Sequence, residues 1–312
     1  MTRKNILGLA LLFLLTGQTA MAQFEIQYPN LLMNDYFYNP ATAGSKDHNP
    51  MRATVRRQWM GIEHAPAQHT VSFDGLLFQY RVGMGIGLMN QSAGPASLNS
   101  INYSWSYRVP YSLNSMFAFG VSGMLAQYVI DYRLLDFDDP NDQLIQKGFR
   151  RSYLPDANAG LYLYSTKYNL HKYFLGVSVL NMLDTEKKLP WFDNQVEAHT
   201  QKRTFCAMAG NRFRLGGKLA FEPSVIAMLD DPEAPENTVV DINGKITWND
   251  SLWVGASYRP EERAAFFLSF MVGSMNIRYS YEISMTDIQV FNYGTHEISL
   301  GILFRRREIK KL

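Results

Sequence analysis

Hydrophobic and polar residues alternate along much of this chain. In residues 275–285, MNIRYSYEISM, Met, Ile and Tyr fill every odd position, while Asn, Arg, Ser and Glu fill every even position. Residues 101–109, INYSWSYRV, repeat the pattern, and in residues 82–88, VGMGIGL, glycine takes the polar positions. A period of two places successive side chains on opposite faces of an extended strand. Each segment therefore predicts a β-strand with one apolar face.

Fourteen segments of the chain are predicted to be strands of this kind. Several of them reach ten residues or more, whereas strands of soluble proteins run about five or six and membrane-spanning strands about 9–11. The fourteen segments lie near residues 52–59, 68–75, 79–90, 98–109, 115–130, 156–166, 173–181, 204–214, 219–229, 238–248, 251–259, 264–272, 275–285 and 295–305.

The links between these segments alternate in length. Links after even-numbered strands are short, whereas most others are longer, and those near 131–152 and 182–203 are the longest. Outer-membrane barrels have short periplasmic turns and longer outside loops. In lipid, an open sheet would leave unpaired backbone groups, each at a cost of several kcal/mol. We therefore expect an all-β fold, a closed antiparallel transmembrane β-barrel of about 14 strands over residues 51–305, with both chain ends in the periplasm.

A soluble β-sandwich or propeller is the alternative fold. No repeat of fixed 20–50-residue period is visible, which disfavours a propeller. Aromatic residues lie on the apolar faces where a barrel needs an interfacial girdle, namely Tyr103, Tyr107, Tyr279 and Tyr281. The long alternating strands and the link pattern favour the barrel.

The first 22 residues have the features of a secretory signal peptide. Arg3 and Lys4 precede an apolar run over residues 6–15, and Ala20-Met21-Ala22 forms a cleavage site. The net charge of +2 gives no reason to expect nucleic acid as a partner. The single cysteine, Cys206, excludes an intrachain disulfide framework and is expected to be a packing residue.

Catalytic and metal-binding patterns are weak in this sequence. The six histidines form no close-spaced metal-ligand pair, and no GxSxG context marks a hydrolase. We therefore expect neither an enzyme nor a resident cofactor. Two acidic stretches in predicted outside loops, residues 136–143 and 230–237, leave calcium binding open.

Residues 52–61, RATVRRQWMG, place arginine on both faces of the first predicted strand. Alternation directs Arg52, Arg56 and Gln58 to the lumen, and leaves Arg57 either near a rim or displaced by a bulge. The lumen arginines either bind an anionic group or pair with lumen acids such as Asp74, Glu222 and Glu282. We favour pairing.

The stretch YFYNPATAGSKDH, residues 36–48, lacks strand periodicity and is rich in aromatic and turn-forming residues. The Asn39-Pro40 pair disfavours helical geometry at Asn39, and Gly44 permits close backbone approach. We expect residues 23–50 to form an extended, plug-like segment that enters the lumen or packs at its rim. The candidate plug residues are Tyr36, Tyr38, Asn39, Pro40, Ala41, Ala43 and Gly44.

Several of these motifs together resemble the PorP/SprF family of outer-membrane proteins. They are NPATAGS (39–45), RRQWMGIEHAP (56–66), GMGIGLMNQSAGP (83–95) and INYSWSYRV. Family members often carry Tyr where Thr42 stands here. The resemblance implies a non-enzymatic barrel of the type IX secretion system and gliding machinery. It also implies partners among large adhesin-like cargo proteins and periplasmic secretion components, including a peptidoglycan-associated lipoprotein.

Further candidate residues follow from the motifs and the tail. A lumen or rim position is expected for Arg52, Arg56, Gln58, Trp59, Gly61 and Pro66. The basic tail over 306–312, after Phe304, suggests periplasmic partner contacts by Arg305, Arg306, Arg307, Lys310 and Lys311. Two other functions compete with secretion: a fatty-acid-channel-like transporter of hydrophobic small molecules, and a lipid hydrolase.

Overall fold

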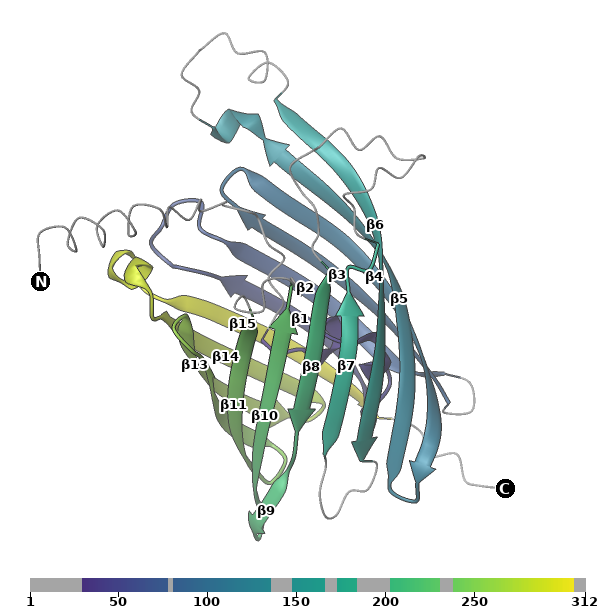
Figure 1. The fold of residues 1–312 in the computed structure, drawn as a ribbon. Helices are drawn as coiled ribbons and strands as arrows, with labels where there is room; N and C mark the ends of the chain where they lie inside the picture. Colours follow the sequence, from purple (N-terminus) through teal and green to yellow (C-terminus); the bar gives the residue numbers. More distant parts are fainter. Residues whose placement is uncertain are drawn as a thin grey trace, which may run out of the picture.

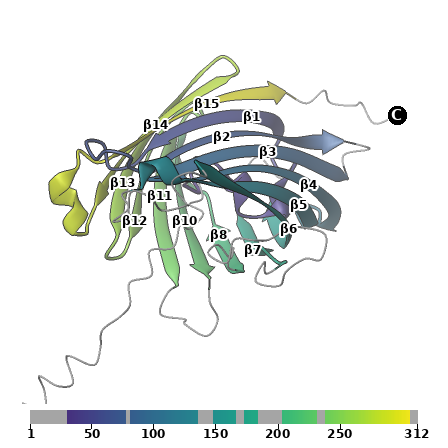
Figure 2. The same ribbon diagram turned by 90° about the horizontal axis from the view of Figure 1, so that it is seen from above.

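The computed structural model describes residues 30–77, 81–135, 148–165, 173–183, 203–230 and 238–305. These residues form one antiparallel sheet that closes on itself, because β1 pairs with β15 and β10 pairs with β11 (Figures 1 and 2). The strands are β1 (His48–Arg57), β2 (Ala67–Leu77), β3 (Val82–Ala93), β4 (Ala96–Ser112), β5 (Ser115–Asp131), β6 (Phe149–Ser165), β7 (Phe174–Leu180), β8 (Thr204–Gly210), β9 (Phe213–Gly216), β10 (Leu219–Leu229), β11 (Val239–Trp248), β12 (Leu252–Arg259), β13 (Arg263–Val272), β14 (Met275–Ser284) and β15 (Thr295–Arg305).

The barrel has 14 strands when β8 and β9 are counted together. Both pair with β10, one after the other, and the wall is interrupted between them at Asn211 and Arg212. Pro223 of β10 lies beside this interruption, and its carbonyl accepts from Asn211 N at 3.0 Å. Because proline has no N–H to donate, it weakens the ladder there. The predicted fold and strand number are confirmed.

Strand lengths divide the wall into a tall side and a low side. β4, β5 and β6 have 17 residues each, whereas β7 and β8 have seven. We call the end that carries the β1–β2 link the loop end and the opposite end the turn end. The tall strands rise above their neighbours at the loop end (Figure 1).

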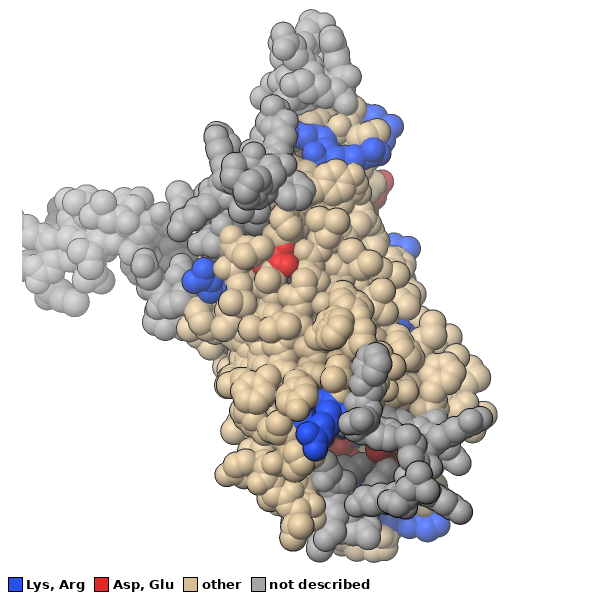
Figure 3. Space-filling view, turned by 90° about the vertical axis from the view of Figure 1, so that its right-hand side faces the viewer, with Lys and Arg blue, Asp and Glu red and all other residues tan. Residues whose placement is uncertain are grey.

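The alternation predicted from sequence places apolar side chains outside and polar ones inside. Tyr103 and Trp105 on β4 are 41% and 47% exposed, while Ser104 and Ser106, which alternate with them, are buried. Figure 3 shows an outer wall that is largely free of charged side chains across its middle. Four short 3-10 helices accompany the described strands: η1 (Asp35–Phe37), η2 (Pro40–Thr42), η3 (Tyr132–Leu134) and η5 (Asp287–Phe291). None of the described helices is long and apolar enough to cross a membrane.

The first strand begins earlier and ends earlier than predicted. β1 starts at His48, and its first residues pair with the last residues of β15. The ladder with β2 continues for one more bond, from Gln58 N to the carbonyl of Pro66, and then stops because Trp59 has a φ of 49°, which a strand does not accommodate. Arg57 is the last, exposed residue of β1 and causes no bulge. It therefore lies at the rim, the first of the two predicted options.

Residues 30–47 precede β1 and lie inside the ring of strands, where their purple ribbon is visible in Figure 2. We call them the inner segment. Tyr38, Asn39, Ala41 and Ala43 have no exposed surface. The three apolar clusters formed by the described residues all include inner-segment residues: Met33 belongs to one, Tyr36 and Phe37 to the second, and Tyr38 and Ala41 to the third.

Candidate functional site

The inner segment starts against one side of the barrel wall. Asn30 Nδ2 lies 3.5 Å from Ser257 Oγ on β12, and Arg278 Nη1 on β14 donates to the carbonyl of Met33 at 2.6 Å. The Met33 side chain packs with Trp253, Ala265 and Phe267. These contacts hold residues 30–33 against β12, β13 and β14.

The same segment then reaches the wall formed by β6 and β7. Ser178 Oγ donates to the carbonyl of Tyr38 at 2.5 Å. Asn39 Nδ2 donates to two main-chain carbonyls, Leu161 O at 3.0 Å on β6 and Val177 O at 3.2 Å on β7. In the ring order these strands lie far from β12–β14. The inner segment therefore connects separate parts of the wall from within.

On its way back to β1 the segment binds the tall side of the barrel. Ser106 Oγ donates to the carbonyl of Ala43 at 2.7 Å, and Arg108 Nη1 donates to the carbonyl of Gly44 at 3.0 Å. Gly44 N donates to Asp74 Oδ2 at 3.0 Å. The main-chain groups of Ala43 and Gly44 thus form hydrogen bonds with side chains of β2 and β4, as buried backbone groups require.

Local sequence explains the shape of the inner segment. Asn34 and Asn39 each cap a 3-10 turn, since Asn34 Oδ1 accepts from Tyr36 N at 3.3 Å and Asn39 Oδ1 accepts from Ala41 N at 2.9 Å. Asn39 is extended, with φ −155° and ψ 115°, as the following Pro40 favours. Each asparagine caps with its oxygen and donates to the wall with its nitrogen. One residue type therefore both forms the turn and anchors it.

Glycines on the inner wall leave the space that the segment occupies. A Cβ on Gly83 would collide with the carbonyl of Ala43, and one on Gly85 would meet the ring of Tyr36. Further along the same wall, Gly120 on β5 leaves no room for a side chain beside Ala41, nor does Gly160 on β6 beside Asn39. We call these four residues the glycine cradle. Gly44 has a φ of +71° and also lies too close to β2 for a side chain.

An ion pair joins η1 to the last residues of the inner segment. Lys46 Nζ donates to Asp35 Oδ1 at 2.6 Å, and Arg52 lies 3.9 Å from the same carboxylate. Burial opposes ionisation of Asp35, but the nearby Lys46 and Arg52 outweigh it and lower its pKa from 3.8 to about 2. Arg52 also pairs with Asp74 at 3.1 Å.

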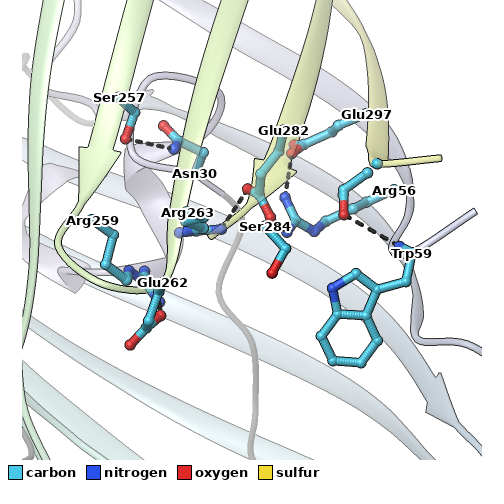
Figure 4. Close-up of polar contacts among 12 residues, drawn as sticks. Asn30, Arg56, Trp59, Ser257, Arg259, Glu262, Arg263, Glu282, Ser284 and Glu297 are labelled. Carbon is cyan, nitrogen blue, oxygen red and sulfur yellow. Dashed lines mark hydrogen bonds and ion pairs between the residues drawn. The ribbon is translucent and has the colours of Figure 1, made fainter. Parts of the chain in front are cut away.

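Inward charges form a second group near the loop end of the barrel (Figure 4). Arg56 Nη2 donates to Glu282 Oε1 at 2.8 Å and Arg56 Nη1 to Glu297 Oε2 at 3.4 Å. Arg263 joins Glu282, at 2.7 Å, to Asp241, at 3.3 Å. Arg259 binds Asp241 through two parallel bonds of 3.0 and 2.7 Å. We call these six residues the mouth network.

The lumen arginines therefore pair with acids, as favoured from the sequence. Arg52 pairs with Asp74 and Arg56 with Glu282. The third acid expected to pair, Glu222, binds Lys245 at 2.6 Å and lies 3.5 Å from Arg212. Alternation predicts which face these residues occupy. It does not reveal partners such as Glu297 and Asp241, because the strand register sets them.

The other candidate rim residues lie in the link between β1 and β2. Met60 N donates to Gly294 O, and Tyr293 N donates back to Met60 O, so this link binds the one before β15. Trp59 N lies 3.3 Å from Thr295 Oγ1, and Gly61 abuts the ring of Tyr293. Pro66 accepts from Gln58 N at 2.9 Å. Gln58, Trp59, Gly61 and Pro66 thus lie at the loop end, next to the mouth network.

Some candidate residues fall outside the described residues. They include the signal peptide, the tail residues Arg306, Arg307, Lys310 and Lys311, and the acidic stretches except Asp230. The backbone of Arg305 ends β15. Cys206 is buried among apolar residues, as expected for a packing residue. No group of three or more potential metal ligands is present among the described residues.

Comparison with solved structures returns outer-membrane barrels of low sequence identity. A Pseudomonas aeruginosa FadL homologue is 9% identical, with 86% of this chain and 93% of that chain covered and a TM-score of 0.48. Acinetobacter baumannii Omp33 is 7% identical, with coverage of 84% and 100% and a TM-score of 0.45. The KdgM porin is 6% identical, with coverage of 83% and 99% and a TM-score of 0.42.

Sequence comparison identifies a family. A search of curated proteins found no significant match. Residues 20–302, however, match the family described as type IX secretion system membrane protein PorP/SprF. This match covers nearly all of the barrel and the whole inner segment. The chain therefore belongs to the PorP/SprF family of type IX secretion system membrane proteins and resides in the outer membrane.

Proposed function

We propose that this barrel assists the secretion or surface anchoring of large cargo proteins, and that its inner segment acts as a plug. Membership of a secretion-system family supports the first part. The observation that carries the second is the path of the inner segment, which binds Ser257 near its start and Ser178 further along, on separate parts of the wall. A segment held at both places obstructs the passage between them.

On this proposal the barrel does not serve as an open pore for its cargo. Large folded cargo does not fit through a 14-stranded barrel whose interior holds side chains and an extra segment. On this proposal the cargo is held at the loop end, where the mouth network and the β1–β2 link lie. Periplasmic components, including a peptidoglycan-associated lipoprotein, dock at the turn end, where the basic tail begins after β15.

Deletion of residues 36–44 tests the plug. Burial of each aromatic ring contributes about 1.5–3 kcal/mol, so the deletion removes much of the free energy that holds the segment inside the barrel. We expect the purified barrel to remain folded, its single-channel conductance to rise and surface display of cargo to fall. A variant with the same residues replaced by Gly and Ser keeps the tether length and serves as the control. Unchanged conductance and normal display in both variants would reduce the segment to a tether.

Affinity capture from detergent-solubilised outer membrane tests the proposed partners. Co-purification of large surface proteins with other secretion components supports the cargo role. Recovery of bound hydrophobic small molecules, without such proteins, would favour the competing fatty-acid-channel-like transporter instead. Lipid turnover by the purified barrel would favour the hydrolase.

A further inference from the structure

The tall side of the barrel leaves part of one strand unpaired at the loop end. β6 pairs with β5 over its whole length, from Phe149 to Ser165. β7 pairs with β6 only from Ala159 to Tyr164. The last main-chain bond from the chain after β7 joins Met182 N to Ala157 O at 2.9 Å. Among the described residues, β6 therefore has no strand neighbour on this side above Ala157.

The free main-chain groups of this edge are identified by alternation. Ser165 N binds Tyr173 O, and Ala157 O binds Met182 N, so odd-numbered residues of β6 face away from β5. In an antiparallel ladder, N–H and C=O groups of alternate residues point to the same side. Phe149, Arg151 and Tyr153 thus present unpaired N–H and C=O groups within the described part of the chain. We call residues 149–153 the free edge.

A proline ends the free edge at its lower side. Pro155 has the same parity as Arg151 and Tyr153, so its nitrogen faces the unpaired side, where no N–H is needed for pairing with β5. Pairing with an added strand is therefore limited to the residues above it. Natural sheets use proline in this way to restrict edges from pairing at random.

Positive charge surrounds the free edge. The Arg151 guanidinium lies 4.5 Å from the centre of the Phe149 ring on the outer face, and the Arg133 guanidinium lies 5.8 Å from it. Asp131, which pairs with Phe149 in the ladder, is already bound by Arg133 through a 2.8 Å bond. Arg150, on the inner face, has no acidic partner among the described residues. The side chains around this edge therefore favour an acidic partner.

The free edge lies beyond the apolar part of the wall. Outward polar side chains cross neighbouring strands at the level of its lower end: Asn90 Nδ2 donates to Asn99 at 2.7 Å, and Gln127 Nε2 donates to the Tyr153 hydroxyl at 2.8 Å. Basic side chains gather at the upper end of the wall in Figure 3. The edge is therefore positioned for contact with a polypeptide rather than with hydrocarbon.

We propose that the free edge binds an acidic, extended segment of a partner protein by strand addition. Main-chain bonds to Phe149, Arg151 and Tyr153 provide affinity, as in other strand-addition complexes. Arg150 and Arg151, on opposite faces, select glutamate or aspartate at neighbouring positions of the added strand. This inference goes beyond the proposed function and holds whether or not the inner segment is a plug.

Amide hydrogen exchange tests the free edge directly, on the full barrel in detergent. In the free protein, the amides of Phe149, Arg151 and Tyr153 are expected to exchange faster than those of Arg150, Ser152 and Leu154, which face β5. A synthetic peptide that alternates glutamate with valine and threonine should slow the three odd-numbered amides. Equal protection of both sets before the peptide is added would overturn the proposal, because the chain itself would then pair this edge.

Peptide binding to variants separates main-chain pairing from side-chain contact. Tyr153→Pro removes one edge N–H and is expected to weaken binding by roughly 2- to 12-fold, the range for one net hydrogen bond. Tyr153→Ala keeps that N–H and should retain most of the affinity. Arg151→Glu should weaken binding and shift preference to a lysine-containing peptide. Heat-modifiable migration on gels checks that each variant is folded.

Two results count against strand addition at this edge. One is the failure of the natural barrel to bind the glutamate peptide. The other is equal binding by folded Tyr153→Pro and Tyr153→Ala variants. The proposal itself predicts that a glutamate peptide with methylated main-chain nitrogens does not bind. Such a peptide keeps its negative charge but has no main-chain N–H groups to donate to the free edge. None of these readings depends on conductance or on cargo display.

Discussion

Asn39 donates a hydrogen bond from its side-chain amide to the main-chain carbonyl of Leu161, 3.0 Å away, and so joins the inner segment to the barrel wall. Its oxygen meanwhile caps the turn at Ala41. Both halves of one buried amide are therefore in use. This single residue couples the shape of the segment to its position in the barrel.

Replacing Asn39 with Leu should release this anchor. The substitution keeps a similar size but leaves Ala41 N without its cap and Leu161 O without its inner donor. A buried polar group left unpaired costs about 1–3 kcal/mol, so we expect the free energy of unfolding to fall by that amount. Chemical denaturation measures it, with Asn99→Leu on the outer wall as a control that should stay near the natural value. An equal loss in both variants would contradict the anchoring role.

The glycine cradle can be tested on a single strand. Gly120→Val would force a side chain into Ala41, whereas Gly123→Val places its Cβ where no other atom lies within 4 Å. Overpacking costs about 1–3 kcal/mol, so we expect Gly120→Val to displace the inner segment. Limited proteolysis between residues 36 and 44 detects the displacement. Similar cleavage of both variants would mean that the cradle does not hold the segment.

Acidification should loosen the inner segment through Asp35. Its pKa is lowered to about 2 in the folded protein, below the unfolded value, so its ionised form stabilises the fold above about pH 4. This contribution is lost as the pH falls from about 4 towards 2. We expect protease protection of residues 36–44 to decrease over that range. Asp35→Asn should lack this pH dependence. If the variant and the natural protein lose protection over the same pH range, Asp35 is not the group responsible.

The mouth network depends on Arg56. Arg56→Leu leaves Glu282 with one partner and Glu297 with none among the six network residues, and breaking a buried pair costs about 3–5 kcal/mol. The neighbouring Arg57 is exposed at the rim, so Arg57→Leu should change stability little. Thermal unfolding of both variants makes the comparison. Adding Glu297→Leu to Arg56→Leu should recover part of the loss, because it removes an unpaired buried charge.

Link lengths predict the orientation of the barrel in the membrane. Peptide tags inserted near Asp139 and Asp193 should be labelled on intact cells, because both positions belong to long links at the loop end. A tag at Gly217, in a short link at the turn end, should be labelled only after the outer membrane is opened. The reverse labelling would invert the orientation.

The sequence was sufficient for the barrel and insufficient for its interior. Residues 275–285 show their two faces by alternation alone, and the structure places Tyr279 outside and Ser280 inside. The partners of Arg56 lie 226 and 241 positions away, so they follow from strand register rather than from spacing. The path of residues 30–47 could not be derived either, because that segment has no period and its shape is set by a wall built from distant strands.

The position of the inner segment has a consequence for how the chain assembles. Its contacts with Ser257 and Arg278 span 227 and 245 residues, so they cannot form until almost the whole chain has been made. Contacts of such long range slow folding. Because the segment directly precedes β1, and β1 joins β15, the pairing that closes the wall also fixes where the segment enters the interior. Closure of the wall and filling of its interior are therefore coupled through β1, the strand that takes part in both.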